Sequence, residues 1–302
     1  MDLMQLHQYA LPRWTKDYQR LTYDEHHIES LGSFGHCNRK TNDPPLRSHI
    51  HMNSMEVTVM LKGTQIYEVD DIVHKLYGNQ IFITLPNIIH SSAGMPQIMA
   101  EFYYFQINLL DSKTILGLDE YHSSYLMGQL LKIEDYIYPG NDNINQLVAD
   151  AFRNISAKDE TLKQCGQSQI ATLLYMLCDI AHSSPCASNN NFLQEVDNYI
   201  HLHIHEPLKI EDIASVFGYS PSYFKTKFRS DAGITPGYYI MRLKIDQSKE
   251  YLKNGKSITE TAMDLSFGSS SYFSTVFHRF TSCTPSEYRQ LALEGKLEVK
   301  EV

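Results

Sequence analysis

An internal duplication near the end of the 302-residue chain constrains its fold more than any other feature. The segment IEDIASVFGYSPSYFKTKFRSDAGITPGYYIMR is repeated in pattern by ITETAMDLSFGSSSYFSTVFHRFTSCTPSEYRQ. Ala214 matches Ala262 at an offset of 48, and a one-residue insertion in the turn then makes the offset 49. The pairs at 49 are Phe224 with Phe273, Phe228 with Phe277, Pro236 with Pro285, and Tyr239 with Tyr288. The duplication predicts one helical unit used twice.

Each copy has the pattern of a helix-turn-helix unit. A short amphipathic helix is followed by a turn and by a second helix with aromatic residues four positions apart. The capping chemistry agrees, because Ser257 with Glu260 forms a capping box and Thr284 with Glu287 forms another. Thr235 precedes a proline in the same way in the first copy. A helix over residues 240–252, carrying Arg242 and Lys244, would then fix the spacing of the two units.

This tandem pattern resembles the DNA-binding domain of the AraC/XylS family of bacterial transcription regulators, over roughly residues 195–290. The resemblance implies two recognition helices, at about residues 221–230 and 270–280, that enter two major-groove segments about 34 Å apart. The implied DNA-facing residues are Ser222, Lys225, Thr226 and Arg229 in the first helix, and Ser270, Ser271, Ser274, Thr275, His278 and Arg279 in the second. The first helix, which carries more long side chains, is expected to supply more direct base readout, and the second more backbone contacts and shape readout.

Aromatic residues and two departures from the family pattern give further expectations for the two copies. We expect four aromatic residues to pack in the core rather than contact DNA: Tyr223, Phe224, Tyr272 and Phe273. Two residues depart from the family pattern. Ser266 stands where a glycine is usual in the second turn, and Ser282 stands where a glycine usually precedes the Thr-Pro pair.

The net charge of −9 is distributed unevenly along the chain. Residues 192–302 carry 13 basic and 14 acidic residues, so almost all of the negative charge belongs to the preceding part. Residues 221–256 contain eight basic residues and three acidic ones. Such a local basic stripe is what a polyanion-binding surface requires. The same residues would also fit the solvated face of ordinary helices.

The preceding part of the chain predicts a different architecture. Residues 1 to about 110 contain short runs of β-branched and aromatic residues, such as EVTVMLKG and QIFITLP, separated by turn-prone residues. Residues 142–183 predict two helices, of which the second is too apolar for a free surface and must pack against the β zone or another subunit. The small polar segment after them predicts a linker. We therefore expect an α+β multidomain protein with domains at residues 1–183 and 192–302, and a linker at 184–191.

The stretch SHIHMNSMEVTVMLKGT contains a candidate ligand site. His49, His51, Glu56 and Gly63 have the spacing H-x-H-x4-E-x6-G, which resembles the first motif of the cupin family. Residues 78–90, which end in His90, resemble the second motif but are one residue shorter than in metal-binding cupins. The resemblance implies a small β-barrel whose interior holds one small ligand.

Strand alternation extends this expectation to neighbouring residues. If His49 and His51 point inward, Arg47 does so too, and if Glu56 does, Thr58 and Met60 share its face. The predicted effector-binding residues are accordingly Arg47, His49, His51, Glu56 and His90. Trp14 could stack on a sugar, or could pack on the outside of the barrel.

Three roles for the three histidines and Glu56 stay open at this point. They could contact an effector, bind a metal ion, or form internal hydrogen bonds. The leading hypothesis is a sequence-specific transcription regulator, expected to be an activator, that responds to a small-molecule effector, with a carbohydrate favoured. The alternative is a metal-dependent cupin enzyme, or a metal-responsive regulator, using the same four residues.

The leading hypothesis carries expectations about partners and location. The expected partners are a double-stranded DNA operator, a sugar-like effector, a second copy of the chain through the helices of residues 142–183, and RNA polymerase. We expect no enzymatic activity, no cofactor and no membrane partner, since no apolar run approaches the ~20 residues of a membrane span. The first residues lack the features of a signal peptide, and the five scattered cysteines fit reduced thiols, so a cytoplasmic location is expected.

Overall fold

The computed structural model describes residues 17–40, 43–95, 97, 99–183, 191–281 and 283–293. The chain forms two compact units, one of residues 1–39 and 44–188, the other of residues 40–43 and 189–302. Trp14, Ser282 and residues 184–190 of the expected linker lie outside the described residues. Within the described residues, no helix is long and apolar enough to cross a membrane.

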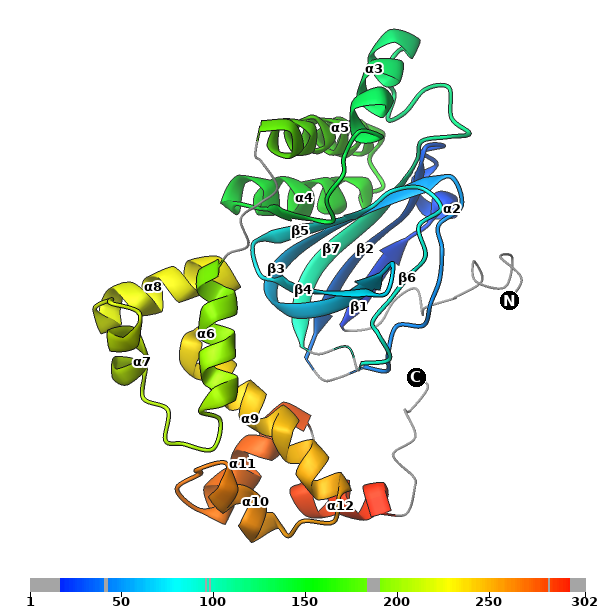
Figure 1. The fold of residues 1–302 in the computed structure, drawn as a ribbon. Coiled ribbons are helices and arrows are strands. Elements are labelled where there is room, and N and C mark those ends of the chain that lie inside the picture. The colour runs from blue at the N-terminus through cyan, green and yellow to red at the C-terminus, as the bar shows by residue number, and fades with distance from the viewer. Residues whose placement is uncertain are drawn as a thin grey trace. The chain divides into compact units, whose positions relative to one another are not determined.

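The first unit is built on an antiparallel sheet of eight strands, as Figure 1 shows. The strands are β1 (Tyr18–Leu21), β2 (Leu31–Arg39), β3 (Ser54–Val69), β4 (Ile72–Tyr77), β5 (Gln80–Thr84), β6 (His90–Ser91), β7 (Ala100–Asn108) and β8 (Ile137–Pro139). Their order is β1-β2-β7-β3-β5-β8, and β4 and β6 both pair with β3. The predicted β-rich zone is confirmed. The strand pairing in the described residues is an open path, so the closed barrel is not confirmed.

The two halves of strand β3 pair with different strands, and this arrangement places the candidate site. Its first half pairs with β5 and β7, whereas residues Thr64 to Val69 pair with β4 and, at the end, with β6. The two halves meet at Gly63, just after a register shift in the pairing with β7. Gly63 has a φ of +84°, and a Cβ atom there would lie 2.4 Å from the carbonyl oxygen of Met99. Only glycine fits this bend without displacing the neighbouring backbone.

The two faces of β3 pack into different hydrophobic clusters. Met55, Val57 and Val59 belong to a core shared with the helices of this unit. Met60 belongs to a second cluster with Tyr67 and other side chains, and Thr58 is buried beside the Tyr67 hydroxyl, 3.3 Å away. Thr58 and Met60 are therefore buried away from the helices, as the alternation of the strand predicts.

Helices cover one face of the sheet (Figure 1). Helix α4 (Asp142–Ile155) packs on β2 and β3, and α5 (Glu160–Ser183) packs on α4. The other helices of this unit are α2 (Tyr23–His26), which contacts β1 and β2, and α3 (Glu120–Leu130), which contacts α5. Buried residues of α4 recur at three- and four-residue spacing: Ile144, Val148, Ala151, Phe152 and Ile155. The two helices predicted within residues 142–183 are confirmed as α4 and α5, whereas α3 had no clear periodic signal.

The second unit is all-helical and carries the duplication (Figure 1). Its helices are α6 (Asn191–Leu202), α7 (Ile210–Val216), α8 (Pro221–Ala232), α9 (Pro236–Lys253), α10 (Ile258–Asp264), α11 (Ser270–Thr281) and α12 (Pro285–Leu293). The capping residues act as predicted: the Ser257 hydroxyl accepts from the Glu260 amide at 3.2 Å, and the Thr284 hydroxyl accepts from the Glu287 amide at the same distance.

The repeated aromatic residues form the same contact in each copy. The rings of Phe228 and Tyr239 lie 5.4 Å apart, and those of Phe277 and Tyr288 lie 5.5 Å apart. Ala214 and Ala262 are both buried, as expected for sites of close helix crossing. The structure therefore confirms two helix-turn-helix units, α7–α8 and α10–α11, joined by α9.

Substitution of Gly63 tests the bend in β3. Gly63→Ala should lower the free energy of unfolding by more than about 2 kcal/mol, because it adds a clash with the backbone to the strain of a positive φ. Gly94→Ala is a matched control, since Gly94 also has a positive φ, +67°, but open space around it. Equal losses for the two variants in chemical denaturation would contradict the steric role of Gly63.

Candidate functional site

The first recognition helix, α8, presents one polar face to solvent. Phe224 and Phe228 are fully buried, so the opposite face of the helix is left free. All four residues predicted to face DNA are exposed: Ser222, Lys225, Thr226 and Arg229. The Lys225 ammonium lies 3.6 Å from the Glu211 carboxylate on α7, so it is held near the start of the motif.

The second recognition helix, α11, has the same arrangement with shorter side chains. Phe273 and Phe277 are buried, while Ser271, Thr275, His278 and Arg279 are exposed. The other two predicted residues, Ser270 and Ser274, are only half exposed.

The hydroxyl groups on both helices are already used as donors. Thr226 donates to the Ser222 carbonyl at 3.1 Å, Thr275 to the Ser271 carbonyl at 3.1 Å, and Ser274 to the Ser270 carbonyl at 2.8 Å. These hydroxyl oxygens therefore offer lone pairs to a base edge, and suit the amino groups of adenine or cytosine.

Two aromatic residues differ from the expectation. Tyr223 is 55% exposed and Tyr272 is 51% exposed, whereas Phe224 and Phe273 are buried as predicted. The prediction that both tyrosines pack in the core was wrong. They occupy equivalent positions in the first turn of α8 and α11, one residue before the buried phenylalanine. A step of one residue rotates a side chain about 100° around the helix axis, so the tyrosine lies outside the buried face. An exposed tyrosine in each motif therefore borders the predicted DNA-facing side chains.

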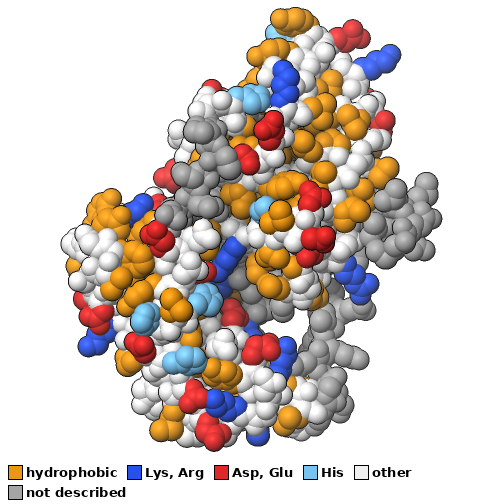
Figure 2. Space-filling model, viewed as in Figure 1, with side chains coloured by type: hydrophobic (Ala, Val, Ile, Leu, Met, Phe, Trp, Pro, Cys, Tyr) orange, Lys and Arg blue, Asp and Glu red, His pale blue; other side chains and the backbone are white. Residues whose placement is uncertain are grey.

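The basic stripe is not a continuous positive surface. Arg242 and Lys244 are buried in the domain. The ion pairs of the others join Lys225 to Glu211, Lys227 to Asp231, Lys249 to Asp246, Lys253 to Glu250, and Lys256 to Asp264. Figure 2 shows basic and acidic side chains interspersed over the part of this unit in view. The charge count thus overstated the positive surface, and the polar faces of α8 and α11 define the candidate interface.

A second candidate site lies in the first unit, where the sheet brings the cupin-like residues together. The ligand atoms of His49, His51 and His90 all lie within 4.8 Å of one another. The Glu56 carboxylate lies 3.0 Å from Nε2 of His51 and 3.6 Å from Nε2 of His90. β3 supplies Glu56, β6 supplies His90, and a bridge between His49 and His90 joins the loop to the sheet. His49 and His51 are partly exposed, so solvent reaches the cluster.

Burial and charge set the protonation of this cluster. Burial, reinforced by the neighbouring His90, lowers the pKa of His49 to about 4. Burial also opposes protonation of His51, but the charge and hydrogen bond of Glu56 outweigh it and raise the pKa of His51. Glu56 is buried, which favours its neutral form, yet its two histidine neighbours hold its pKa well below the usual range. The site therefore favours a charged Glu56 carboxylate, which in turn favours protonation of His51, beside a His49 ring whose protonation is disfavoured.

The backbone fixes how two of the rings are oriented. Nδ1 of His49 donates to the Arg47 carbonyl at 2.9 Å, and Nδ1 of His90 donates to the Ile88 carbonyl at 3.2 Å. A neutral ring that donates from Nδ1 has an unprotonated acceptor at Nε2, and the lowered pKa of His49 favours this form. Nε2 of His90 is buried without a hydrogen-bond partner, although the Glu56 carboxylate is near. A donor-rich ligand or a cation would satisfy acceptors placed in this way.

Further residues complete the cluster, and one predicted residue does not join it. Arg47 is exposed, so the expectation that it shares the inward face is not met. Gln106 on β7 donates to Glu56 at 2.9 Å, and its role had no sequence signal because β7 is distant in the chain. The ring of Tyr67 lies 6.4 Å from that of His90 and stacks on Phe82, which adds an aromatic wall.

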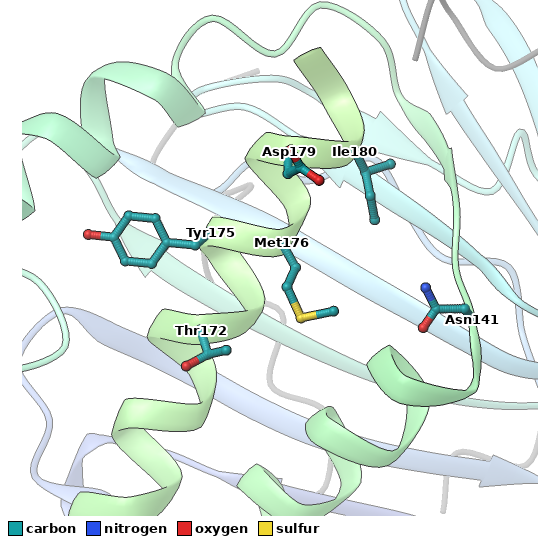
Figure 3. A pocket seen from close by; sticks show the side chains of 6 residues that line it. All are labelled: Asn141, Thr172, Tyr175, Met176, Asp179 and Ile180. Atoms are coloured by element: carbon teal, nitrogen blue, oxygen red, sulfur yellow. The ribbon is translucent and has the colours of Figure 1, made fainter. Parts of the chain in front are cut away.

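The outer face of α5 carries a pocket away from this cluster. Its lining residues are Asn141, Thr172, Tyr175, Met176, Asp179 and Ile180. Figure 3 shows that five of them project from α5 and that Asn141 comes from the segment before α4. The aromatic surface continues on α3, where Tyr121 and Tyr125 are exposed. This face is apolar and has no clustered titratable groups among the lining residues, so it resembles a contact surface more than a chemical site.

Comparisons with known proteins identify the helix-turn-helix domain in the second unit. Residues 213–291 match a family model described as a helix-turn-helix domain. The chain is 22% identical over 240 residues to an uncharacterized HTH-type transcriptional regulator of Staphylococcus aureus (strain COL), covering 79% of this chain and 32% of that protein. It is 28% identical over 174 residues to the HTH-type transcriptional activator RhaS of Enterobacter sp. (strain 638), covering 54% of this chain and 63% of that protein.

A solved structure also matches the second unit. The AraC-type DNA-binding domain protein from Chromobacterium violaceum is 27% identical, covers 35% of this chain and 96% of that chain, and has a TM-score of 0.33. The chain spans about a third of the length of the staphylococcal relative. The family match over residues 213–291 shows that the second unit contains a helix-turn-helix domain. The cupin-like character of the first unit remains a prediction.

Replacement of Lys225 tests the assigned face of α8. Lys225→Ala should weaken binding to a DNA site selected from a random library and relax preference at one base position, by about 1–3 kcal/mol. Glu211→Gln should not weaken binding, because it releases Lys225 from its ion pair and removes a negative charge beside the DNA. Affinity and footprint unchanged in the Lys225 variant would count against this face.

Proposed function

We propose that this chain is a sequence-specific DNA-binding transcription regulator whose activity responds to a small molecule bound in the first unit. The observation that carries the proposal is the repeated helix-turn-helix, with the same face of α8 and α11 exposed in both copies. One chain then reads two major-groove segments about a helical turn apart.

The proposed effector is a hydroxyl-rich molecule, with a carbohydrate as the favoured class. Its hydroxyl groups would donate to Glu56 and to the unprotonated Nε2 atoms of His49 and His90. The aromatic wall at Tyr67 suits the apolar faces of a sugar ring. The family resemblance favours the same class.

The output proposed for the bound effector is activation through the DNA-binding unit. Effector binding would shift the chain between pre-existing arrangements rather than create a new one. We further propose that the chain forms a homodimer through α5 and the adjacent α3, whose exposed face is apolar. RNA polymerase is the proposed partner at the promoter.

A metal-responsive regulator is the second candidate, and a specific observation favours it. Three imidazoles converge within 4.8 Å, and the Nδ1 atoms of His49 and His90 are anchored by backbone carbonyls, an arrangement common in metal-ligating histidines. The residues present fit a divalent ion, which His49, His51, His90 and Glu56 would hold. In a regulator the ion would act as the signal, whereas in the enzyme alternative it would polarise a substrate.

Ligand titration separates these possibilities. Protein purified without chelator is titrated with monosaccharides and separately with Zn²⁺, and thermal unfolding and affinity for the selected DNA site are followed. We expect a monosaccharide to raise the melting temperature and change DNA affinity by about 5–150-fold, the usual size of allosteric coupling. A response to Zn²⁺ alone would favour the metal-responsive candidate. Turnover of a substrate without DNA binding would favour the enzyme.

Two variants connect the response to the histidine cluster. His90→Ala should abolish it, because His90 is buried and its Nε2 faces the site. His122→Ala is the matched control, since His122 is exposed and its ion pair with Asp119 lies on the surface, and it should respond like the wild type. Equal responses from both variants would place the effector elsewhere.

A further inference from the structure

The two helix-turn-helix motifs are joined by more than the shared helix α9. His205 and Glu206 lie between α6 and α7, in the segment that leads into the first motif, and His205 contacts the C-terminal end of α10 in the second. The His205 ring donates from Nδ1 to the Asp264 carbonyl at 3.0 Å, and the Ser266 hydroxyl donates to the His205 carbonyl. The segment before the first motif and the second motif thus each supply a side-chain donor to the backbone of the other.

Lys244 on α9 adds two further bonds at the same place. Its ammonium donates to the Glu206 carbonyl at 2.9 Å and to the Leu265 carbonyl at 2.7 Å. The side chain is buried, so these bonds are shielded from water. The end of a helix leaves carbonyl groups without intrahelical partners and attracts a cation. Lys244 therefore fastens the end of α10 to the loop of the first motif.

Ser266 is the unusual member of this group. It lies 48 positions after Gly218, and both residues occupy the turn that follows the first helix of their motif. Gly218 has a φ of +70° and Ser266 a φ of +52°, and Gly268 does not take over the left-handed position. The turn bonds are also alike, since the amides of Tyr219 and Phe267 each donate to the buried alanine carbonyl at 2.9 Å.

Besides the one-residue insertion, the two turns differ in what a side chain would meet at Gly218 and at Ser266. A Cβ atom at Gly218 would have open space around it, whereas the Ser266 side chain reaches the carbonyl of His205. A serine in a left-handed conformation is disfavoured relative to glycine, so local geometry gives no reason for it. Its hydroxyl bond to the other motif does.

We propose that Ser266 is a positioning residue that, with His205 and Lys244, fixes the distance and angle between the two recognition helices and so selects the spacing of the two DNA half-sites. This inference rests on the proposed function, because it requires that both motifs bind DNA. A rigid connection lets the protein discriminate between half-sites of different spacing. One added base pair moves the second half-site by about 3.4 Å and rotates it by roughly a tenth of a turn.

Spacing discrimination is the measurement. The full chain is titrated with its selected DNA site and with versions that have one base pair added or removed between the half-sites. The wild type should lose about tenfold or more in affinity on either change, because one half-site is then misplaced. Ser266→Gly and Ser266→Ala should reduce this penalty to within about threefold. These variants should bind the site of correct spacing less tightly than the wild type does, and should bind the sites of altered spacing almost equally well.

Gly218→Ser is the matched control. It places a serine at the equivalent turn of the first motif, where open space surrounds the side chain, and should keep the wild-type spacing penalty. Circular dichroism establishes that each variant is folded, and Ser266→Gly relieves the backbone, so loss of fold is not expected for it. His205→Phe removes the ring donor while keeping an aromatic ring near Tyr251, and should reduce the penalty partly.

The outcomes separate the two claims. A wild type that binds no DNA site specifically would overturn the proposed function. A wild type with a strong spacing penalty that Ser266→Gly and Ser266→Ala both retain would overturn the positioning role alone. A reduced penalty in Gly218→Ser as large as in the Ser266 variants would also overturn it, since strain in either turn would then be sufficient.

Discussion

Burial of paired phenylalanines in each recognition helix is the constraint on which the DNA-binding unit depends. Phe224 and Phe228 in α8, and Phe273 and Phe277 in α11, lie four residues apart and are fully buried. Removing one such side chain from a core typically costs about 3–5 kcal/mol, far more than the surface ion pairs around it contribute. The phenylalanines thus fix the rotation of each helix about its axis. The polar face opposite them is left for DNA as a consequence.

The first unit depends on a balance between the cost of burying the Glu56 carboxylate and the polar contacts that compensate it. Glu56 is a buried carboxylate, which would be unstable alone, and the charge of His51 together with the amide of Gln106 compensates it. His90 stays beside this pair with an acceptor nitrogen that has no partner. A core built only for stability would satisfy such an atom. This acceptor is the feature of the interior that supports the proposed ligand site.

The sequence predicted those features that repeat or alternate along it, and missed those decided by contacts between distant segments. The two motifs and the helix caps follow from local spacing, whereas the grouping of His49, His51, Glu56 and His90 was what the resemblance to the cupin family implied. Gln106 enters the site only because β7 pairs with β3, and the open path of the sheet depends on the same pairings. The exposure of Tyr223 and Tyr272 depends on the rotation of each helix about its axis relative to the core. Ser266 was noted as a departure, but its partner, the His205 carbonyl, lies 61 residues away.

Selection of bound DNA from a random library by the full chain, followed by footprinting, tests the central claim most directly. The account predicts two short conserved segments for each protein chain, with centres about 10–10.5 base pairs apart on one face of the duplex, and protection over both. A single conserved segment, or binding with no sequence preference at physiological salt, would contradict the claim that both helix-turn-helix motifs read DNA.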